Sequence, residues 1–339
     1  MGMKTLATVL SVLAAGIAVI GVGAGVTTAS AARPARPAVR AGRTARVTAV
    51  PGGRTASKAA TEAESAVPAT AAATAAAAVS PDVRVSEGIC TAPSAYRALA
   101  AKLSADIEDA LRGRPGQQAV SVYDAVTQVS CYVNSSQHFS SASIVKTIIL
   151  ATLLRWHQQT GTPLSATEKK EATLMITQSD NDAATYLWDE VGMDRLQDFL
   201  DAAKMNETEL GQDGYWGLTQ VTAHDELVLL ELLDEPNPVL DSASRGYVLG
   251  LMSQVISAQR WGTPYGAPDD VTVHVKNGWL ADPLWHVNSL GVFTGKDGTD
   301  KNYLIAVLTD GNPTEQDGID TIQNVAKAVH RDLNGAKPS

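Results

Sequence analysis

The stretch "FSSASIVKTIIL" at residues 139–150 places a serine three positions before a lysine, at the start of an apolar run. The run from Ile144 to Trp156 is almost entirely apolar, which predicts a helix buried on every side. Ser143 then lies at the first turn, where its backbone N–H has no partner within the helix. Lys146 lies one turn in, and burying an unpaired ammonium is costly. This lysine must therefore either reach solvent by snorkelling or be held by polar partners as a base.

Two further polar motifs follow along the chain. Residues 179–181 read "SDN", in a turn between two predicted helices, and residues 275–279 read "VKNGW", at the end of an alternating strand. A lone Ser-x-x-Lys pattern is weak evidence, because about one is expected by chance in a chain of this size. The three motifs in this order favour a serine nucleophile over the alternative of a helix-capping serine and a snorkelling lysine.

The residue types suit acyl transfer. A serine hydroxyl is a poor nucleophile until a base removes its proton, and the Lys146 amine can reach Ser143 because helix positions i and i+3 share a face. Burial and the nearby cation of Lys276 would both lower the pKa of Lys146, as a base requires. Ser179 can relay a proton to the leaving group. Asn181 can hold a substrate amide, and Lys276 can attract a substrate carboxylate.

With these residues in place, the chain resembles the serine β-lactamase and penicillin-binding protein superfamily, and most closely the class A β-lactamase-like serine hydrolases of actinobacterial type. The family signatures are Ser-x-x-Lys, Ser-Asp-Asn and Lys-Thr/Ser-Gly. The resemblance spans about residues 90–335 and implies a second oxyanion donor in the backbone N–H of Trp279. It matches the signatures to Ser143 and Lys146, Ser179 and Asn181, and Lys276 and Gly278.

Two departures from the family pattern bear on substrate binding. Asn277 stands where the family has a hydroxyl side chain, so its expected contact with a substrate carboxylate is altered. Only 36 residues separate Ser143 from Ser179, fewer than in typical class A enzymes, and the missing segment would form one wall of the cleft.

A third departure concerns hydrolysis of the acyl-enzyme, for which class A enzymes use a glutamate in a Glu-x-x-Leu-Asn stretch. The nearest string is "ETELG" at 207–211, which lacks the asparagine and comes early. Aligning on "YWGLTQVTAHD" at 215–225 instead puts Gly217 at the position of the glutamate, and this alignment is favoured. Glu207 and Glu209 stay as candidates beside the alternative of two solvated surface acids. Without a base, Ser143 can still be acylated while its ester hydrolyses slowly, as in penicillin-binding proteins.

The remaining patterns predict an α+β fold. An antiparallel sheet is flanked by N- and C-terminal helices, an all-helical subdomain is inserted into it, and the active site lies between the two parts. Ser165 and Glu168 form a capping box at the start of one helix. The expected helices are 94–112, 144–156, 166–177 and 319–333, with further helical patterns in "NDAATYLWDEV" and "ELVLLELL". The expected strands are 119–125, 129–134, 271–279, 286–295 and 303–311.

The first quarter of the chain is not globular in composition. Residues 1–31 are typical of a signal peptide, with Lys4, a long uncharged stretch and small residues before Ala31, which predicts a secreted or extracytoplasmic protein. The alternative is an uncleaved membrane anchor, because the apolar run is long enough to span a bilayer. Residues 32–87 contain no Leu, Ile or aromatic residue and are expected to be a disordered tether. Residues 88–339 are expected to form the hydrolase domain.

Charge divides at the same place. Residues 1–84 carry nine basic and three acidic side chains, and residues 85–339 carry 18 and 33, which together give the net charge of −9. The acidic folded part excludes a nucleic-acid partner, whereas the basic tether is either a solvated linker or a contact to wall polymer or membrane surface. The six histidines are scattered, so no metal and no cofactor is expected. The expected partner is a β-lactam or a wall-peptide-like small molecule, bound by a monomer.

The chain has two cysteines, Cys90 and Cys131. In an exported protein the pair predicts one disulfide, and the alternative is two unpaired buried thiols. A bond across this separation of 41 residues would stabilise the fold by roughly 4 kcal/mol in the chain-entropy model.

Overall fold

The computed structural model describes residues 84–296 and 298–335. The predicted signal peptide and nearly all of the predicted tether lie outside these residues. No helix among the described residues is long and apolar enough to cross a bilayer. The strands are β1 (Arg84–Glu87), β2 (Cys90–Pro93), β3 (Gln117–Asp124), β4 (Val129–Val133), β5 (His138–Ser140), β6 (Gln220–Thr222), β7 (Val271–Asp282), β8 (Leu284–Gly295) and β9 (Asn302–Asn312). The helices are α1 (Arg97–Leu111), α2 (Val145–Thr160), α3 (Ala166–Thr177), α4 (Asn181–Ala203), α5 (Ala223–Asp234), α6 (Ser242–Ser253) and α7 (Glu315–Gly335).

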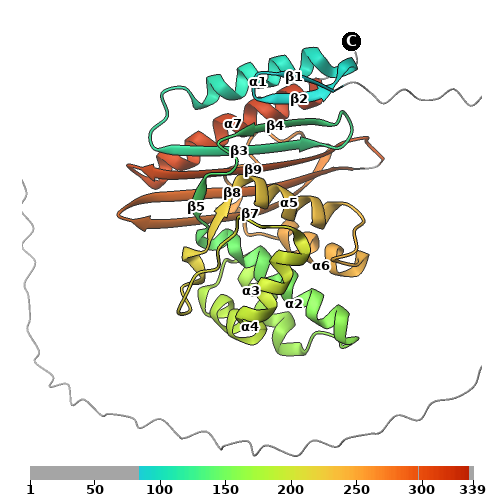
Figure 1. The fold of residues 1–339 in the computed structure, drawn as a ribbon, viewed down its shortest axis with the longest axis vertical. Helices are drawn as coiled ribbons and strands as arrows, with labels where there is room; N and C mark the ends of the chain where they lie inside the picture. Colours follow the sequence, from blue (N-terminus) through green and yellow to red (C-terminus); the bar gives the residue numbers. More distant parts are fainter. Residues whose placement is uncertain (1–83, 297, 336–339) are drawn as a thin grey trace, which may run out of the picture. The chain divides into compact units, whose positions relative to one another are not determined.

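Seven strands form one antiparallel sheet in the order β1-β2-β4-β3-β9-β8-β7, which leaves β7 at an edge. Helices α1 and α7 cover one face, and α5 with the helical group α2, α3, α4 and α6 lies on the other (Figure 1). This arrangement confirms the predicted α+β fold, with terminal helices and an inserted helical part. The connection from β5 to β6 contains α2, α3 and α4, so this insertion is made of consecutive helices.

Alternate residues of β9 belong to two separate apolar cores. Tyr303, Ile305 and Val307 pack beneath α1 and α7, whereas Leu304, Ala306 and Leu308 face the helical part. Because both faces of the sheet are covered, β9 is a nearly continuous apolar run instead of an apolar–polar alternation. The same double coverage explains why the strands near the end of the chain were predictable from hydropathy alone.

Helix α2 ends at a glycine. Gly161 has φ +65°, the left-handed conformation that favours glycine after the last turn of a helix. The expected helix over 144–156 therefore continues to Thr160 before it stops. The predicted capping box of α3 is confirmed, because Glu168 N donates to Ser165 Oγ at 3.1 Å and Ser165 N donates to Glu168 Oε2 at 2.6 Å.

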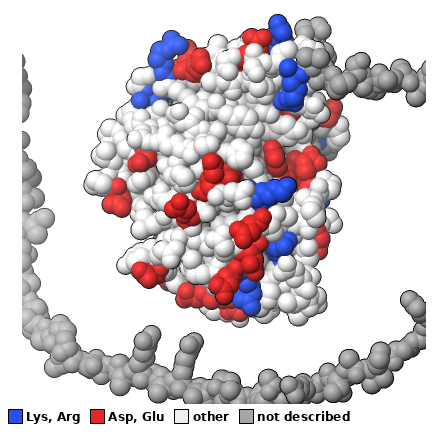
Figure 2. Space-filling model, viewed as in Figure 1, with Lys and Arg blue, Asp and Glu red and all other residues white. Residues whose placement is uncertain are grey.

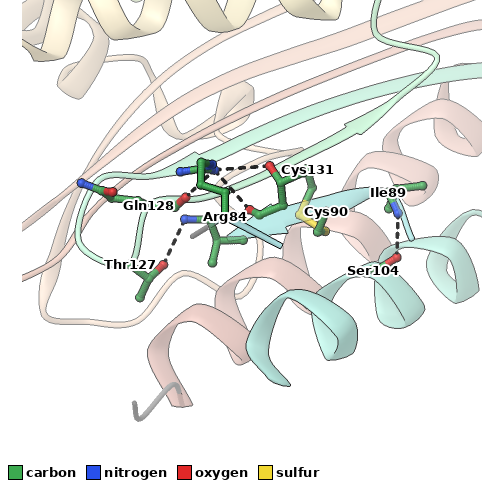
Figure 3. Close-up of a disulfide and its surroundings, with 9 residues drawn as sticks. Arg84, Ile89, Cys90, Ser104, Thr127, Gln128 and Cys131 are labelled. Atoms are coloured by element: carbon green, nitrogen blue, oxygen red, sulfur yellow. Dashed lines mark hydrogen bonds between the residues drawn. A yellow bond between two sulfur atoms is a disulfide. The ribbon is translucent and has the colours of Figure 1, made fainter. Parts of the chain in front are cut away.

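The N-terminal edge of the sheet is tied down by the disulfide between Cys90 and Cys131, which confirms the predicted bond (Figure 3). The bond joins β2 to β4. Arg84 Nη2 donates to the Gln128 carbonyl at 3.0 Å, and Ile89 N donates to Ser104 Oγ on α1 at 3.0 Å. The expected tether therefore extends too far, because its last four residues, Arg84–Glu87, pair as β1 with β2.

Carboxylates are more widespread than basic side chains on the face drawn in Figure 2. This distribution agrees with the acidic balance of the sequence after residue 84.

Candidate active site

Ser143 lies in a short 3₁₀ turn, Ala142–Ile144, immediately before α2. The chain entering this turn is anchored to the sheet, because the Asn288 amide on β8 donates to the carbonyls of Ser140 and Ser141 at 2.9 and 3.1 Å. Ala142 has φ +48°, an uncommon conformation for a residue with a side chain. Ser143 is half-buried, and its hydroxyl makes no hydrogen bond within the described part of the chain. The hydroxyl is therefore free to react.

Strand β7 passes directly beside this serine. A Cβ placed on Gly278 would lie 2.7 Å from the backbone nitrogen of Ser143 and 2.8 Å from that of Ile144. Real Cβ atoms do not approach backbone so closely, so this position requires glycine. Gly278, which the sequence predicted as a substrate-binding residue, thus lies next to the turn of Ser143.

The backbone N–H of Trp279 lies on the free edge of β7. Trp279 pairs with Val287 on β8. The Val287 carbonyl accepts a hydrogen bond at 2.7 Å from the hydroxyl of Thr309 on β9, which lies on the side of β8 away from β7. Since N–H and C=O of one residue in an antiparallel strand face the same neighbour, Trp279 and Val287 face away from each other. The Asn277 carbonyl, two residues earlier on this edge, accepts from Lys276 Nζ at 2.7 Å. The N–H of Trp279 is thus unused by the sheet, as an oxyanion donor must be.

Lys146 is fully buried, with 0 % of its surface exposed. Its Nζ donates to the Ser179 carbonyl at 2.6 Å, to Ser179 Oγ at 3.2 Å and to Asn181 Oδ1 at 2.8 Å. Burial lowers the pKa of this amine to about 7, although the carboxylate of Asp180 acts in the opposite direction. Lys146 is therefore not a snorkelling lysine, and near neutral pH a large fraction of it is the neutral amine.

Lys276 on β7 shares the hydroxyl of Ser179 with Lys146, because Lys276 Nζ donates to Ser179 Oγ at 3.0 Å. This lysine is 1 % exposed. Burial, and then the positive charge of Lys146, hold the pKa of Lys276 well below its usual range. The structure thus brings together Lys146, Ser179, Asn181 and Lys276 from two helix starts, a turn and a strand.

The turn between α3 and α4 holds Ser179 in an uncommon conformation. Its φ is +57°, which is rare for a residue other than glycine. The following residue, Asp180, caps α4 by accepting a hydrogen bond from Ala183 N at 2.8 Å. Such backbone conformations cluster at functional sites, where the surrounding structure over-determines them.

Asn277 differs from the prediction in its surroundings. Its side-chain amide donates to the carbonyls of Gln259 and Trp261, both at 2.9 Å, and the residue is 0 % exposed. The side chain thus supports the segment before β7, and its amide is not available to a ligand. The substitution of an amide for the family hydroxyl is explained by this supporting role.

Two residues near Ser143 have roles that sequence reasoning missed. Trp216 lies with its ring over Lys146, at 4.8 Å from Nζ to the ring centroid. Asn288 holds the chain before Ser143, as described above. The available signals were an aromatic residue directly before Gly217 and a buried amide within an apolar strand.

Gly217 lies next to the turn that carries Ser143. A Cβ at this glycine would be 3.9 Å from both Cα and the carbonyl oxygen of Ala142, which is ordinary van der Waals contact. A side chain at position 217 would therefore fit beside the serine turn.

The two candidate glutamates differ in their surroundings. Thr222 Oγ1 donates to Glu207 Oε2 at 3.3 Å. A carboxylate oxygen of Glu207, a carboxylate oxygen of Asp225 and a ring nitrogen of His224 all lie within 4.8 Å of one another. Glu209 is exposed and pairs through its backbone with Gln220. Neither carboxylate makes a described contact with Ser143 or Lys146.

A model of the beta-lactamase enzyme family matches residues 156–333, just over half of the chain. The match includes Ser179 and Lys276 and begins after Ser143 and Lys146. A search of curated proteins finds no match.

Solved structures share the fold at low sequence identity. A class A beta-lactamase from Bacteroides cellulosilyticus is 17% identical, with a TM-score of 0.61 over 69% of this chain and 98% of that one. A beta-lactamase from Sphaerobacter thermophilus is 19% identical, with a TM-score of 0.59 over 70% and 98%. PBP-A is 18% identical, with a TM-score of 0.60 over 69% and 96%. The family match and the shared fold imply a hydrolase, and the chain belongs to the beta-lactamase enzyme family.

Proposed function

We propose that this chain is an exported active-site-serine hydrolase of class A β-lactamase type, acylated at Ser143 by a β-lactam or a related wall-peptide amide. It releases the acyl group slowly. The observation that carries the proposal is the pair of buried lysines, Lys146 and Lys276, that share the hydroxyl of Ser179. Ser143 lies in the turn that directly precedes the helix of Lys146.

Acylation follows from this geometry. The neutral Lys146 amine takes the proton of Ser143 as Oγ attacks the carbonyl carbon of the amide. The negative charge that develops on the carbonyl oxygen is stabilised by the backbone N–H groups of Ser143 and Trp279. The Ser179 hydroxyl then gives its proton to the leaving nitrogen and is reprotonated by Lys146. The C–N bond breaks, an ester forms on Ser143, and Lys146 is neutral again.

Substrate binding uses the remaining polar groups. Asn181 accepts from Lys146 through Oδ1, which leaves its Nδ2 to donate to an amide carbonyl of the substrate. Lys276 provides the positive potential for a substrate carboxylate. A cavity of 390 Å³ lies between segment 214–218 and residues 280–282 at the end of β7, and it offers room for an apolar acyl group.

We expect slow release of the acyl group from Ser143, because residue 217 is a glycine and has no carboxylate to activate water. This residue stands where the resemblance expects the glutamate that activates water. Glu207 accepts a hydrogen bond from Thr222, and the side chain of Glu209 is exposed. A variant of PBP-A, whose fold is similar, is solved as an acyl-enzyme complex with penicillin G, so a scaffold of this kind can carry a penicillin ester. The glycine also favours the second candidate, a D,D-peptidase or penicillin-binding-like enzyme, or a module that binds peptidoglycan or β-lactams without turnover.

Export is supported by the disulfide between Cys90 and Cys131, since such bonds persist in oxidising compartments. The predicted signal peptide and basic tether would deliver the hydrolase domain to the wall or membrane surface.

Intact-mass spectrometry of the purified chain with penicillin G, followed over hours, tests the proposal beside a Ser143→Ala control. The expected result is an adduct of one ligand mass on the wild type alone, which forms within minutes and decays slowly. Rapid decay with accumulating product would instead indicate efficient turnover. No adduct with penicillin G, followed by none with a serine-reactive phosphonate, would refute the serine mechanism.

A further inference from the structure

The ring of Trp216 lies against the Lys146 amine, next to its hydrogen-bond partners. The polar partners of Nζ are Ser179 and Asn181, and the ring centroid lies 4.8 Å from the same nitrogen. Trp216 itself is half-buried, whereas Lys146 is fully buried.

Contacts on both sides fix the position of this ring. The indole Nε1–H donates to Thr185 Oγ1 on α4 at 3.2 Å. The next residue, Gly217, accepts a hydrogen bond through its carbonyl from Ser141 Oγ at 3.5 Å, which ties the turn to the chain just before Ser143. Trp216 is thus attached to the helix start that carries Asn181 and to the loop that carries the serine.

Two opposing effects of the ring act on the amine. An aromatic face attracts an ammonium and so favours its charged form, whereas exclusion of water disfavours that form. Burial lowers the pKa of Lys146 to about 7, so we expect exclusion of water to be the larger of the two effects of the ring. The charged groups that face Lys146 are Asp180 at the start of α4, which raises its pKa, and Lys276 on β7, whose Nζ meets it across Ser179.

We propose that Trp216 is a positioning residue whose ring keeps bulk water away from Lys146 and from the ester on Ser143. The ring thereby holds the amine neutral for acylation and prolongs the life of the ester. The second part rests on the proposed function, whereas the first concerns Lys146 alone.

NMR titration of ¹³C-lysine-labelled chain tests the first part without any substrate. The Lys146 signal is assigned by its loss in Lys146→Met. In Trp216→Ala we expect its pKa to rise by about one unit or more, because water reaches the amine. Trp216→Phe keeps a ring over the amine and should leave the pKa of Lys146 near the wild-type value. Tyr215→Ala is the second control, because Tyr215 is 66% exposed, and it should also leave this pKa unchanged. Trp216→Leu provides the test should the alanine variant not fold, with a smaller rise.

An unchanged or lower pKa in Trp216→Ala would overturn the first part, and a fall would mean that the attraction between ring and cation is the larger effect. Ester half-life by intact-mass spectrometry tests the second part, with a several-fold decrease expected in Trp216→Ala and little change in Trp216→Phe. An unchanged half-life would overturn it. If the wild type forms no ester, the proposed function fails while the titration still decides whether Trp216 shields Lys146.

Discussion

Lys146 and Lys276 donate hydrogen bonds to a single acceptor, the hydroxyl of Ser179, at 3.2 and 3.0 Å. Two ammonium groups so placed repel each other, and burial adds to the cost of charging both. Each lysine therefore disfavours the charged form of the other, next to a hydroxyl that can pass a proton. This pair is the physical basis for assigning acyl-transfer chemistry to the site.

The first prediction concerns the pH dependence of acylation. A protonated Lys146 cannot accept a proton from Ser143, so the acylation rate should fall as pH drops through about 7, approaching tenfold per unit below it. Stopped-flow measurement with a chromogenic β-lactam between pH 5 and 8.5 checks this. A flat profile across that range would show that Lys146 is not the base.

Gly278→Ala tests the close approach of β7 to the serine turn. The added Cβ would lie 2.7 Å from Ser143 N, so the backbone must shift and the oxyanion site widen. A displacement of this kind should lower the acylation rate about 100-fold. Gly246→Ala on α6, where a Cβ meets nothing within 4 Å, serves as the control and should retain the wild-type rate. Equal rates in both variants would contradict the proposed role of this edge.

Gly217→Glu should accelerate release of the acyl group. The position has room for a side chain beside the turn of Ser143, and a carboxylate there could activate a water molecule. General-base assistance is worth on the order of 10²–10⁴-fold, so a gain of at least tenfold is expected. Gly217→Gln, which has the same size without a base, should keep the slow wild-type release. If both variants release the ester equally fast, the gain comes from a structural change and not from the carboxylate.

The buried Glu226 on α5 should make the stability of the folded chain depend on pH. It is 0 % exposed, neither of its carboxylate oxygens has a partner among the described residues, and burial raises its pKa to about 8. The unfolded chain therefore loses this proton near pH 4.5 and the folded chain near pH 8. Between these values the folded state binds more protons, so its stability falls as pH rises.

Glu226→Gln removes this titration. Thermal melts should show the variant gaining stability relative to the wild type as pH increases from 5 to 8, by a few kcal/mol in total. A constant difference between the two proteins over that range would mean that Glu226 has a charged partner in solution.

The sequence predicted the elements that hydropathy alone specifies. The core strands β7 to β9, the buried helix α2 and the capping box of α3 have strong local patterns. Strands β1, β2, β5 and β6 have three or four residues each, too few for a period to emerge, and α6 follows Pro238 without a distinct apolar stripe. The pairing of β2 with β4 and of β5 with β6 joins segments that are far apart in the sequence.

The candidate site was predictable in its residue types but not in its contacts. Motif order pointed to Ser143, Lys146, Ser179 and Lys276, because their chemistry is specific. The use of the Asn277 amide on two backbone carbonyls and the placement of Trp216 over Lys146 depend on loops that meet only in the folded chain. Such contacts leave no periodic signal.

Peptide mapping of the penicillin-treated chain tests whether Ser143 is the residue that is acylated. The protein is quenched in acid after brief exposure, digested and analysed by tandem mass spectrometry. We expect one ligand mass on the peptide that contains Ser143, with fragment ions that locate it on that residue and on no other serine. A modification on Ser179 or on a lysine, or an unmodified Ser143 peptide in a protein that consumes penicillin, would contradict it.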